Sequence, residues 1–194
     1  KKFLVNSSKF FKNNFKGYKV LGVHFRGTDR ITGSNHPMPP TLKQMFYLVD
    51  ESLKRYKFDK IHLVTDDIRY FDAFKKRYKN KLTYRKESFR SKQSKIFHLK
   101  VRKNHRYEIG RDNIEEMLIL SKLKFLICST SNLSQIAAMI SKNNYKIMEI
   151  NNEWNSKSLL IAQFKFYIKS FLPKYFFGFD KKPELKFIDF KDKI

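Results

Sequence analysis

The strongest constraint on the fold is a repeated switch in the apolar pattern between residues 18 and 150. Short apolar runs typical of buried strands occur at 18–25, 60–67, 81–84, 124–130 and 145–150. Apolar residues at helical spacing lie between most of these runs, at 41–53, 68–78, 113–123 and 132–140. Alternating strands and helices are typical of a parallel sheet with crossover helices. We therefore predict an α/β fold over 18–150, a Rossmann-like, mostly parallel sheet flanked by helices.

Two flanking regions complete the predicted organisation. Residues 1–17 form an N-terminal lead-in segment, and residues 151–194 form a C-terminal helical tail. Within the tail, 156–179 predicts a long helix whose apolar face carries Leu160, Phe164, Tyr167 and Phe171. That face either packs against the sheet domain or lies on an anionic membrane surface with lysines at the headgroups.

The charge balance is strongly basic. The 194 residues include 42 Lys and Arg against 18 Asp and Glu, a net charge of +24. Nucleic acid, an anionic membrane or a phosphorylated substrate would each suit this charge, and so would a plain compositional bias towards Lys, Asn, Ile and Phe. The long basic loop predicted over 85–111, with aromatics interleaved in the tail, favours a nucleic-acid-binding domain as one alternative.

Cysteine usage and hydropathy bear on the compartment. A single cysteine, Cys128, excludes an intrachain disulfide and favours a reducing compartment. The chain has neither a signal-peptide h-region nor 18 consecutive apolar residues, and its five histidines show no zinc-ligand spacing. We therefore expect a cytoplasmic protein without a metal or cofactor, with the tail as a candidate peripheral membrane contact.

Polar groups follow three of the predicted strands, in "HFRGTD", "VTDD" and "CSTSN". Carboxyl ends of parallel strands share one edge of a sheet, where ligands bind. Arg26 offers a planar fork that suits a phosphate, and Gly27 allows a close backbone approach. The hydroxyls of Ser129, Thr130 and Ser131 precede a helix whose first amides can hold an anion. This set complements a nucleoside diphosphate.

Each of these groups can also be explained by a purely structural role. Asp66 and Asp67 precede a helix and fit the role of helix caps. The sequence also allows an N-cap at Ser131 or Asn132, a hydrogen-bonded core histidine at His24, and an ion pair between Arg26 and Asp29. Convergence of so many groups on one edge nevertheless favours a binding site.

Three blocks in this order resemble the motifs of the GDP-fucose-dependent fucosyltransferases, the superfamily of α1,6-, nodulation and protein O-fucosyltransferases. "VHFRGTDR" resembles their HxRxxD signature, and "HLVTDD" resembles their second motif. "IEEMLILSKLKFLICSTSNLSQIAAMI" is similar to their third, an acidic helix, a strand and a Ser-rich turn into a helix. The resemblance implies the donor-binding, C-terminal half of a GT-B glycosyltransferase that holds GDP-fucose without metal.

The resemblance also implies roles for single residues. Arg26 matches the arginine on the β-phosphate and is the one catalytic residue implied, while Glu116 falls where the family has an aspartate that contacts guanine. His24, Ser131 and Asn132 match further donor-site positions, and Gly27, Ser129 and Thr130, taken from their place at the strand ends, complete the predicted donor-binding set. The motif acids Asp29, Asp66 and Asp67 are implied to be structural.

The chain departs from the family pattern in two ways. Ser34 stands where the α1,6 enzymes carry the glutamate that serves as the catalytic base. No carboxylate lies between Asp29 and Asp50, so the catalytic base of this chain is unassigned. The residues before Tyr18 are too few for the family's N-terminal domain, so we expect a fragment or a member reduced to its donor half. The predicted function is transfer from a GDP-sugar, GDP-fucose in particular, to a glycan or lipid-linked acceptor hydroxyl. A nucleic-acid-binding domain and a non-catalytic sugar-nucleotide binder are the two competing interpretations.

Overall fold

The centre of the molecule is a six-stranded sheet. A computed structural model describes residues 2–93, 96–142 and 144–193, and it orders the strands β3-β2-β1-β4-β5-β6. The strands are β1 (Val20–His24), β2 (Lys60–Val64), β3 (Leu82–Thr83), β4 (Phe125–Cys128), β5 (Lys146–Glu149) and β6 (Ile188–Asp189). The first five are parallel, and β6 runs antiparallel to β5. The predicted α/β fold with a mostly parallel sheet is thus confirmed.

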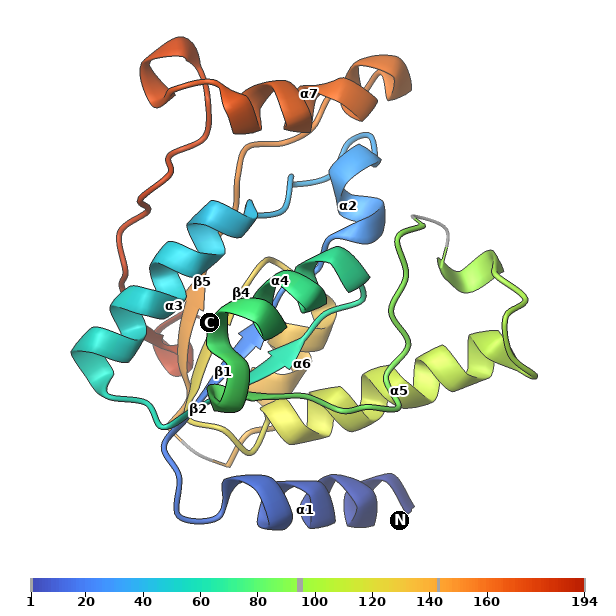
Figure 1. Ribbon diagram of the computed structural model, residues 1–194, viewed down its shortest axis with the longest axis vertical. Coiled ribbons are helices and arrows are strands. Elements are labelled where there is room, and N and C mark those ends of the chain that lie inside the picture. Colours follow the sequence, from blue (N-terminus) through green and yellow to red (C-terminus); the bar gives the residue numbers. More distant parts are fainter. Residues whose placement is uncertain (1, 94–95, 143, 194) are drawn as a thin grey trace.

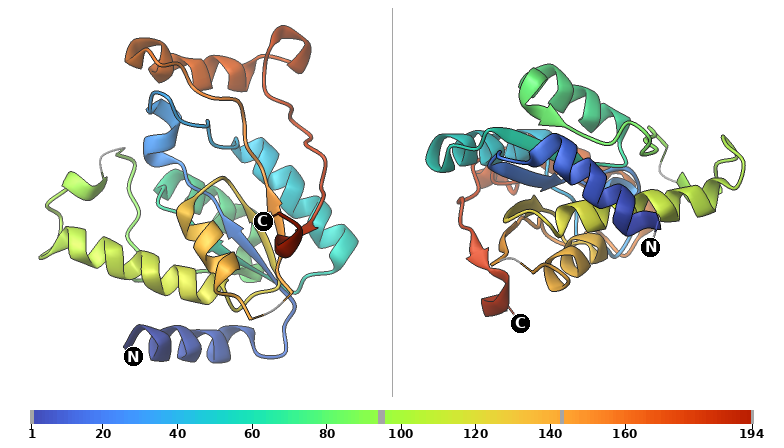
Figure 2. Two further views of the ribbon diagram at one scale, coloured as in Figure 1. Left: turned by 180° about the vertical axis from the view of Figure 1, so that it is seen from behind. Right: turned by 90° about the horizontal axis from the view of Figure 1, so that it is seen from below.

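Helices cover both faces of the sheet, as Figure 2 shows. One face carries α3 (Leu42–Tyr56) and α4 (Ile68–Tyr78). The other carries α1 (Lys2–Phe15), α5 (His105–Leu120) and α6 (Asn132–Met139). A short helix, α2 (Thr28–Thr32), follows β1, and α7 (Leu159–Phe171) lies beyond it at the edge of the molecule (Figure 1).

Each face of the sheet has its own apolar core. Leu21 and Val23 of β1 pack with the residues of α3 and α4, while Val20 belongs to the core formed with α5 and α6. Every residue of β1 is buried, as expected for a strand covered on both faces. Gly22 sits against Leu123, because an added Cβ would lie 3.0 Å from that side chain. The central strand is therefore closely packed on both faces up to its carboxyl end at His24.

A capping box marks the start of α3. The Gln44 N–H donates to Thr41 Oγ1 (3.2 Å), and the Thr41 N–H donates to Gln44 Oε1 (2.8 Å). The reciprocal pair satisfies two backbone donors at the helix end and fixes where the helix begins.

Three regions differ from the sequence-based expectation. The predicted lead-in segment contains α1, which packs along α5 and buries Phe15 beside His62, their ring centroids 5.2 Å apart. The predicted loop over 85–111 ends early, because α5 begins at His105. The predicted tail helix over 156–179 ends at Phe171, and the chain then returns to add β6 to the sheet.

Candidate functional site

A cavity of about 310 Å³ lies at the carboxyl edge of the sheet. Strand order reverses direction at β1, whose neighbours are β2 and β4, and ligands of open α/β sheets bind beside such a switch point. The cavity takes residues from the ends of β1 and β2, from α5, from the start of α6 and from the loop before α5. Its polar lining residues are His24, Arg26, Thr65, Asp66, Ser88, Asp112, Asn113, Glu116, Ser131 and Asn132.

Arg26 enters this cavity two residues after the end of β1. Its side chain is 27% exposed, and its Nε lies 3.9 Å from Asp66 Oδ2. Asp66 also accepts hydrogen bonds from the Gly27 N–H (3.2 Å) and the Thr28 hydroxyl (2.8 Å). Because Asp66 keeps two other donors, it does not depend on Arg26, whose guanidinium can also turn to an anion in the cavity.

His24 lies at the carboxyl end of β1 and lines the same cavity. It is buried, and its Nδ1 is 2.6 Å from Ser134 Oγ on α6. Burial lowers the pKa of His24 to about 3, and the Arg26 charge adds to this effect while Glu116 opposes it. The predicted alternative of a hydrogen-bonded core histidine therefore describes its geometry, and its imidazole is neutral near pH 7.

The start of α6 forms a second wall. Ser131 caps the helix by accepting from the Leu133 N–H (3.3 Å), so the N-cap alternative holds for Ser131. Asn132 is exposed, and both residues line the cavity. The positive end of the α6 dipole thus faces the space that Arg26 enters, and both features favour an anion.

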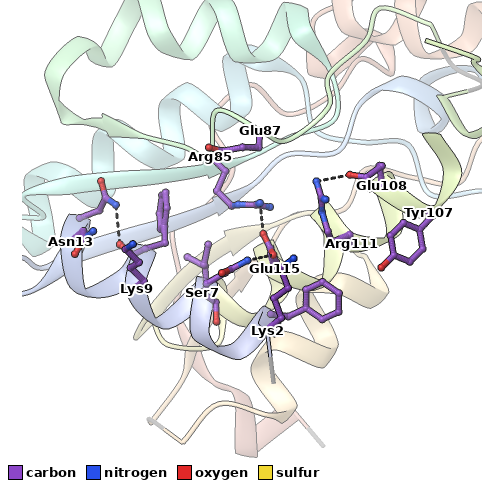
Figure 3. A pocket seen from close by; sticks show the side chains of 15 residues that line it. Lys2, Ser7, Lys9, Asn13, Arg85, Glu87, Tyr107, Glu108, Arg111 and Glu115 are labelled. Carbon is purple, nitrogen blue, oxygen red and sulfur yellow. Dashed lines mark hydrogen bonds and ion pairs between the residues drawn. The ribbon is translucent and has the colours of Figure 1, made fainter. Parts of the chain in front are cut away.

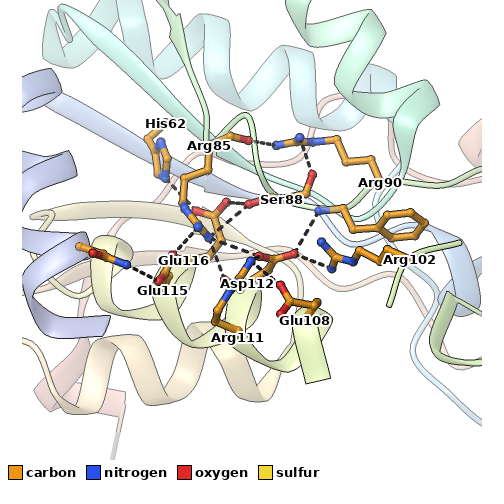
Figure 4. Close-up of polar contacts among 12 residues, drawn as sticks. His62, Arg85, Ser88, Arg90, Arg102, Glu108, Arg111, Asp112, Glu115 and Glu116 are labelled. Carbon is orange, nitrogen blue, oxygen red and sulfur yellow. Dashed lines mark hydrogen bonds and ion pairs between the residues drawn. The ribbon is translucent and has the colours of Figure 1, made fainter. Parts of the chain in front are cut away.

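Glu116 is held at the back of the cavity by polar contacts (Figure 4). Its Oε2 lies 3.2 Å from His62 Nε2, and its Oε1 accepts from the Ser88 hydroxyl (2.6 Å). Burial favours a higher pKa, but the bonds from His62 and Ser88 and the charge of Arg85 outweigh it, so the pKa of Glu116 lies below its usual range. Glu116 is therefore an ionised acceptor whose two oxygens already have protein donors.

Asp112, one turn before Glu116, lines the cavity and was not singled out from the sequence. Its Oδ2 accepts from Arg102 (2.8 Å), while its buried Oδ1 has no hydrogen-bond partner among the described residues and lies 3.6 Å from the Arg111 guanidinium. Its spacing of four residues from Glu116 on a helix was the signal available in the sequence. Two carboxylates on α5, not one, are thus placed to accept hydrogen bonds in the cavity.

Arginines of the preceding loop pair with the acidic face of α5, as Figure 4 shows. Arg85 pairs with Glu115 and, at 4.0 Å, with Asp112, and it is buried. Arg111, on α5 itself, pairs with Glu108 at 2.5 Å. The pairs of Arg85 fasten the middle of α5 to the loop, while at the start of the helix His105 is buried and its Nε2 lies 3.0 Å from the Ile96 carbonyl oxygen.

Three residues of the predicted donor-binding set lie outside the cavity lining. The space beside Gly27 is filled by Tyr70, since an added Cβ would lie 2.2 Å from the ring, so its missing side chain admits a protein ring and not a ligand. Ser129 and Thr130 line a separate, very small hollow with Arg30. Thr130 donates there to Glu149 Oε1 (2.5 Å). The side of the turn that faces the cavity is formed by Ser131 and Asn132.

The three acids predicted to be structural fall into two groups. Asp67 is the N-cap of α4, accepting from the Arg69 N–H (2.9 Å), and Asp66 binds the start of α2, so both act at helix starts. Asp29 lies in α2, but its side chain is outside the part of the chain that the structure describes. The predicted Arg26–Asp29 pair is therefore left as a prediction.

A larger hollow, of about 660 Å³, lies between α1 and α5 (Figure 3). Several of its polar groups already have partners: Arg85 pairs with Glu115, Arg111 pairs with Glu108, and the Asn6 amide donates to Glu115 (3.0 Å). It lies along two helices and away from the strand ends. We therefore take the smaller cavity at the sheet edge as the candidate site.

Metal sites and membrane-spanning helices are both absent from the described part of the chain. Among the described residues, no group of three or more His, Cys, Asp or Glu side chains could hold a metal ion. No helix in the described ranges is long and apolar enough to cross a membrane.

The comparisons with known proteins give a fold match and no sequence match. No protein-family model matches the chain, and no curated protein does. A crystal structure of the NodZ α-1,6-fucosyltransferase soaked with GDP-fucose matches with a TM-score of 0.52 at 16% identity, over 78% of this chain and 49% of that one. The same enzyme co-crystallised with GDP matches with a TM-score of 0.50 at 15% identity, over 78% and 47%. The chain has a fucosyltransferase-like fold.

The match has a defined extent. This chain spans about half the length of the fucosyltransferase structures, and its identity to them is low. The likeness therefore establishes the α/β fold of a GT-B fucosyltransferase and leaves the chemistry to the residues of the site.

Proposed function

We propose that the chain binds a GDP-sugar, GDP-fucose in particular, in the cavity at the carboxyl edge of the sheet and takes part in glycosyl transfer. The observation that carries the proposal is the meeting of Arg26 with the N-terminus of α6 at the switch point of the sheet. A guanidinium and a helix N-terminus together suit a diphosphate. The fold match to an enzyme whose crystals were soaked with GDP-fucose supports this choice of nucleotide.

The chemical role proposed for Arg26 is electrostatic. When a sugar leaves GDP, negative charge develops on the β-phosphate, and a fixed guanidinium stabilises that charge. Arg26 and the N-terminus of α6 supply the positive charge that faces the diphosphate, so no metal ion is required in this proposal. A base for the acceptor hydroxyl is unassigned, and a non-catalytic binder remains the competing form of the same site.

Guanine recognition is proposed for the carboxylates of α5. The N1–H and amino group of guanine are adjacent donors, which one carboxylate can accept together. Glu116 already accepts from His62 and Ser88, whereas Asp112 Oδ1 has no hydrogen bond among the described residues, although it lies 3.6 Å from Arg111 and 4.0 Å from Arg85. The variants Glu116→Gln and Asp112→Asn distinguish the two residues. Removing the charge of the residue that binds guanine should abolish the protein's preference for GDP over UDP.

The nucleic-acid alternative has less support from the geometry. Arg85 and Arg102 of the basic loop pair with Asp112 or Glu115, and Arg90 stacks its guanidinium 4.4 Å from the Phe71 ring centroid. These arginines support the wall of the cavity instead of an exposed basic strip. A nucleic acid would therefore have to bind through exposed lysines.

Calorimetry tests the proposal with GDP, GDP-fucose, GDP-mannose and UDP as ligands. GDP should bind more tightly than UDP. Arg26→Ala should weaken the binding free energy of GDP by about 1.5–3 kcal/mol, because one charge-assisted contact is lost. Arg26→Lys should recover little of this, because a point charge cannot form the fork. Arg55→Ala, which removes an exposed arginine from α3, is the matched control.

Two outcomes would contradict or narrow the proposal. Equal GDP affinity in Arg26→Ala and the wild type would contradict the proposal that the diphosphate binds beside Arg26. Release of GDP from GDP-fucose, measured on the intact chain with and without acceptor glycans, separates a transferase from a binder.

A further inference from the structure

The segment from α7 to residue 177 exposes a concentration of large apolar side chains. Phe171 is 83% exposed and Leu160 is 73% exposed. The whole set, which we call the α7 face, is Leu159, Leu160, Ile161, Phe164, Tyr167, Ile168, Phe171, Tyr175, Phe176 and Phe177. Contiguous exposed apolar surface of this kind marks an interaction site on proteins that otherwise cover such groups.

The helix is held to the molecule by its other side. Ala162 and Phe166 are its buried residues, and Phe166 packs on Phe179 with ring centroids 5.7 Å apart. At 100° per residue, Leu160, Phe164 and Phe171 share an arc roughly opposite to this contact. The predicted alternative in which this face packs against the sheet domain is therefore wrong, because that face points away from the core.

Charge favours one occupant of the α7 face. Residues 153–194 contain nine lysines against five carboxylates. Lys165 and Lys169 pair with Glu153 and Lys174 pairs with Asp180, while Lys157 flanks the apolar residues and is exposed. Trp154, which is 60% exposed, adds an aromatic beside the helix, where Lys165 donates to its carbonyl oxygen (2.7 Å). A second copy of the chain would bring two basic surfaces together, whereas an anionic bilayer complements both the charge and the apolar side chains.

We propose that the α7 face docks this protein on the surface of an anionic lipid bilayer. The aromatic and aliphatic side chains would enter the interface between headgroups and acyl chains, with the lysines at the headgroups. The inference stands on the α7 face alone and does not depend on the ligand of the cavity.

The position of α7 has a consequence for the site. It packs against α2, which begins at Thr28, two residues after Arg26 (Figure 1). A docked molecule would therefore hold the carboxyl edge of the sheet towards the bilayer, which suits an acceptor presented at a membrane surface.

Vesicle sedimentation with the full chain tests the proposal. The wild type should bind vesicles that contain phosphatidylglycerol, bind those of phosphatidylcholine alone far less, and lose binding as salt is added. The variant Leu160→Ser/Phe164→Ser/Phe171→Ser should bind the anionic vesicles about tenfold or more weakly, since three large apolar side chains no longer enter the interface. Val5→Ser/Met139→Ser removes exposed apolar groups from α1 and α6 and should bind as the wild type does.

The design keeps folding and binding separate. Deleting the tail is unsuitable, because Phe166, Phe179 and Leu185 belong to the core and β6 belongs to the sheet. Circular dichroism and thermal unfolding should match among the three proteins, because the altered side chains are exposed. Failure of the wild type to bind anionic vesicles, or equal binding by the triple variant, overturns the proposal. So does a wild-type dimer that the triple variant converts to a monomer without any vesicle binding, which would make the α7 face a self-association surface.

Discussion

Acidification should destabilise the protein through His24, and the size of the effect follows from its burial. Burial lowers the pKa of His24 to about 3, helped by Arg26 and Arg30 and opposed by Glu116. In the unfolded chain an imidazole has a pKa of about 6.5. Between these values the unfolded state binds a proton that the folded state does not, so stability falls as the pH falls through this window.

The magnitude follows from these two values. Below the unfolded pKa of about 6.5, each pH unit costs about 1.4 kcal/mol, and about 1.5 units of the interval from about pH 7.5 to about pH 5 lie below it. Stability should therefore fall by about 2 kcal/mol through this group alone. Urea unfolding at both pH values measures it in the wild type and in His24→Asn. Asparagine does not titrate and can still hydrogen-bond Ser134, the partner 2.6 Å from Nδ1. The wild type should therefore lose about 2 kcal/mol more than the variant over this interval.

Other titrating groups are common to both proteins and cancel in the difference. His36→Asn is the matched control, because it removes an exposed histidine by the same substitution. Equal losses in the wild type and His24→Asn would refute the reasoning. An NMR titration that found His24 protonated near pH 6 would refute it independently.

Three further predictions concern packing, ion pairs and metal. Gly27→Ala should destabilise the fold by about 1–3 kcal/mol in thermal unfolding, because its Cβ would meet the Tyr70 ring, and unchanged stability would disprove that contact. Arg85→Ala should cost about 3–5 kcal/mol in urea unfolding, since Glu115 and Asp112 lose a buried partner, and a loss below about 1 kcal/mol would mean that they stay solvated. GDP should bind equally well with EDTA and with Mg²⁺, and a strong metal requirement in calorimetry would point to a different kind of transferase.

The parts of the fold that were predictable from sequence are those set by local patterns. Local sequence is enough to indicate the strands that end at His24 and Val64 and the helix cap at Thr41. The two-residue strand β6 depends on pairing with β5, some forty residues earlier, which leaves no local pattern. The first turns of α5 were missed because a polar contact with the preceding loop, from His105 to the Ile96 carbonyl oxygen, helps to hold them and produces no apolar period.

The same distinction applies to the candidate site. Arg26, His24 and Ser131 were placed at one edge by the topology of a parallel sheet, and the structure brings them to one cavity. The Tyr70 ring that fills the space beside Gly27 could not be predicted, because it comes from α4, a different element. The outward direction of the α7 face could not be predicted either, since an amphipathic pattern identifies a face without saying what covers it.

The two kinds of basic side chain in this protein are used in different places. Seven of the ten arginines form ion pairs with described carboxylates, as Arg85 does on α5, while most of the lysines that the structure describes are exposed. The outer field is therefore carried by flexible, hydrated ammonium groups that attract anions over a distance without fixing their orientation. An anionic ligand should accordingly meet this protein quickly at low ionic strength and more slowly as salt is added, while its rate of departure changes little.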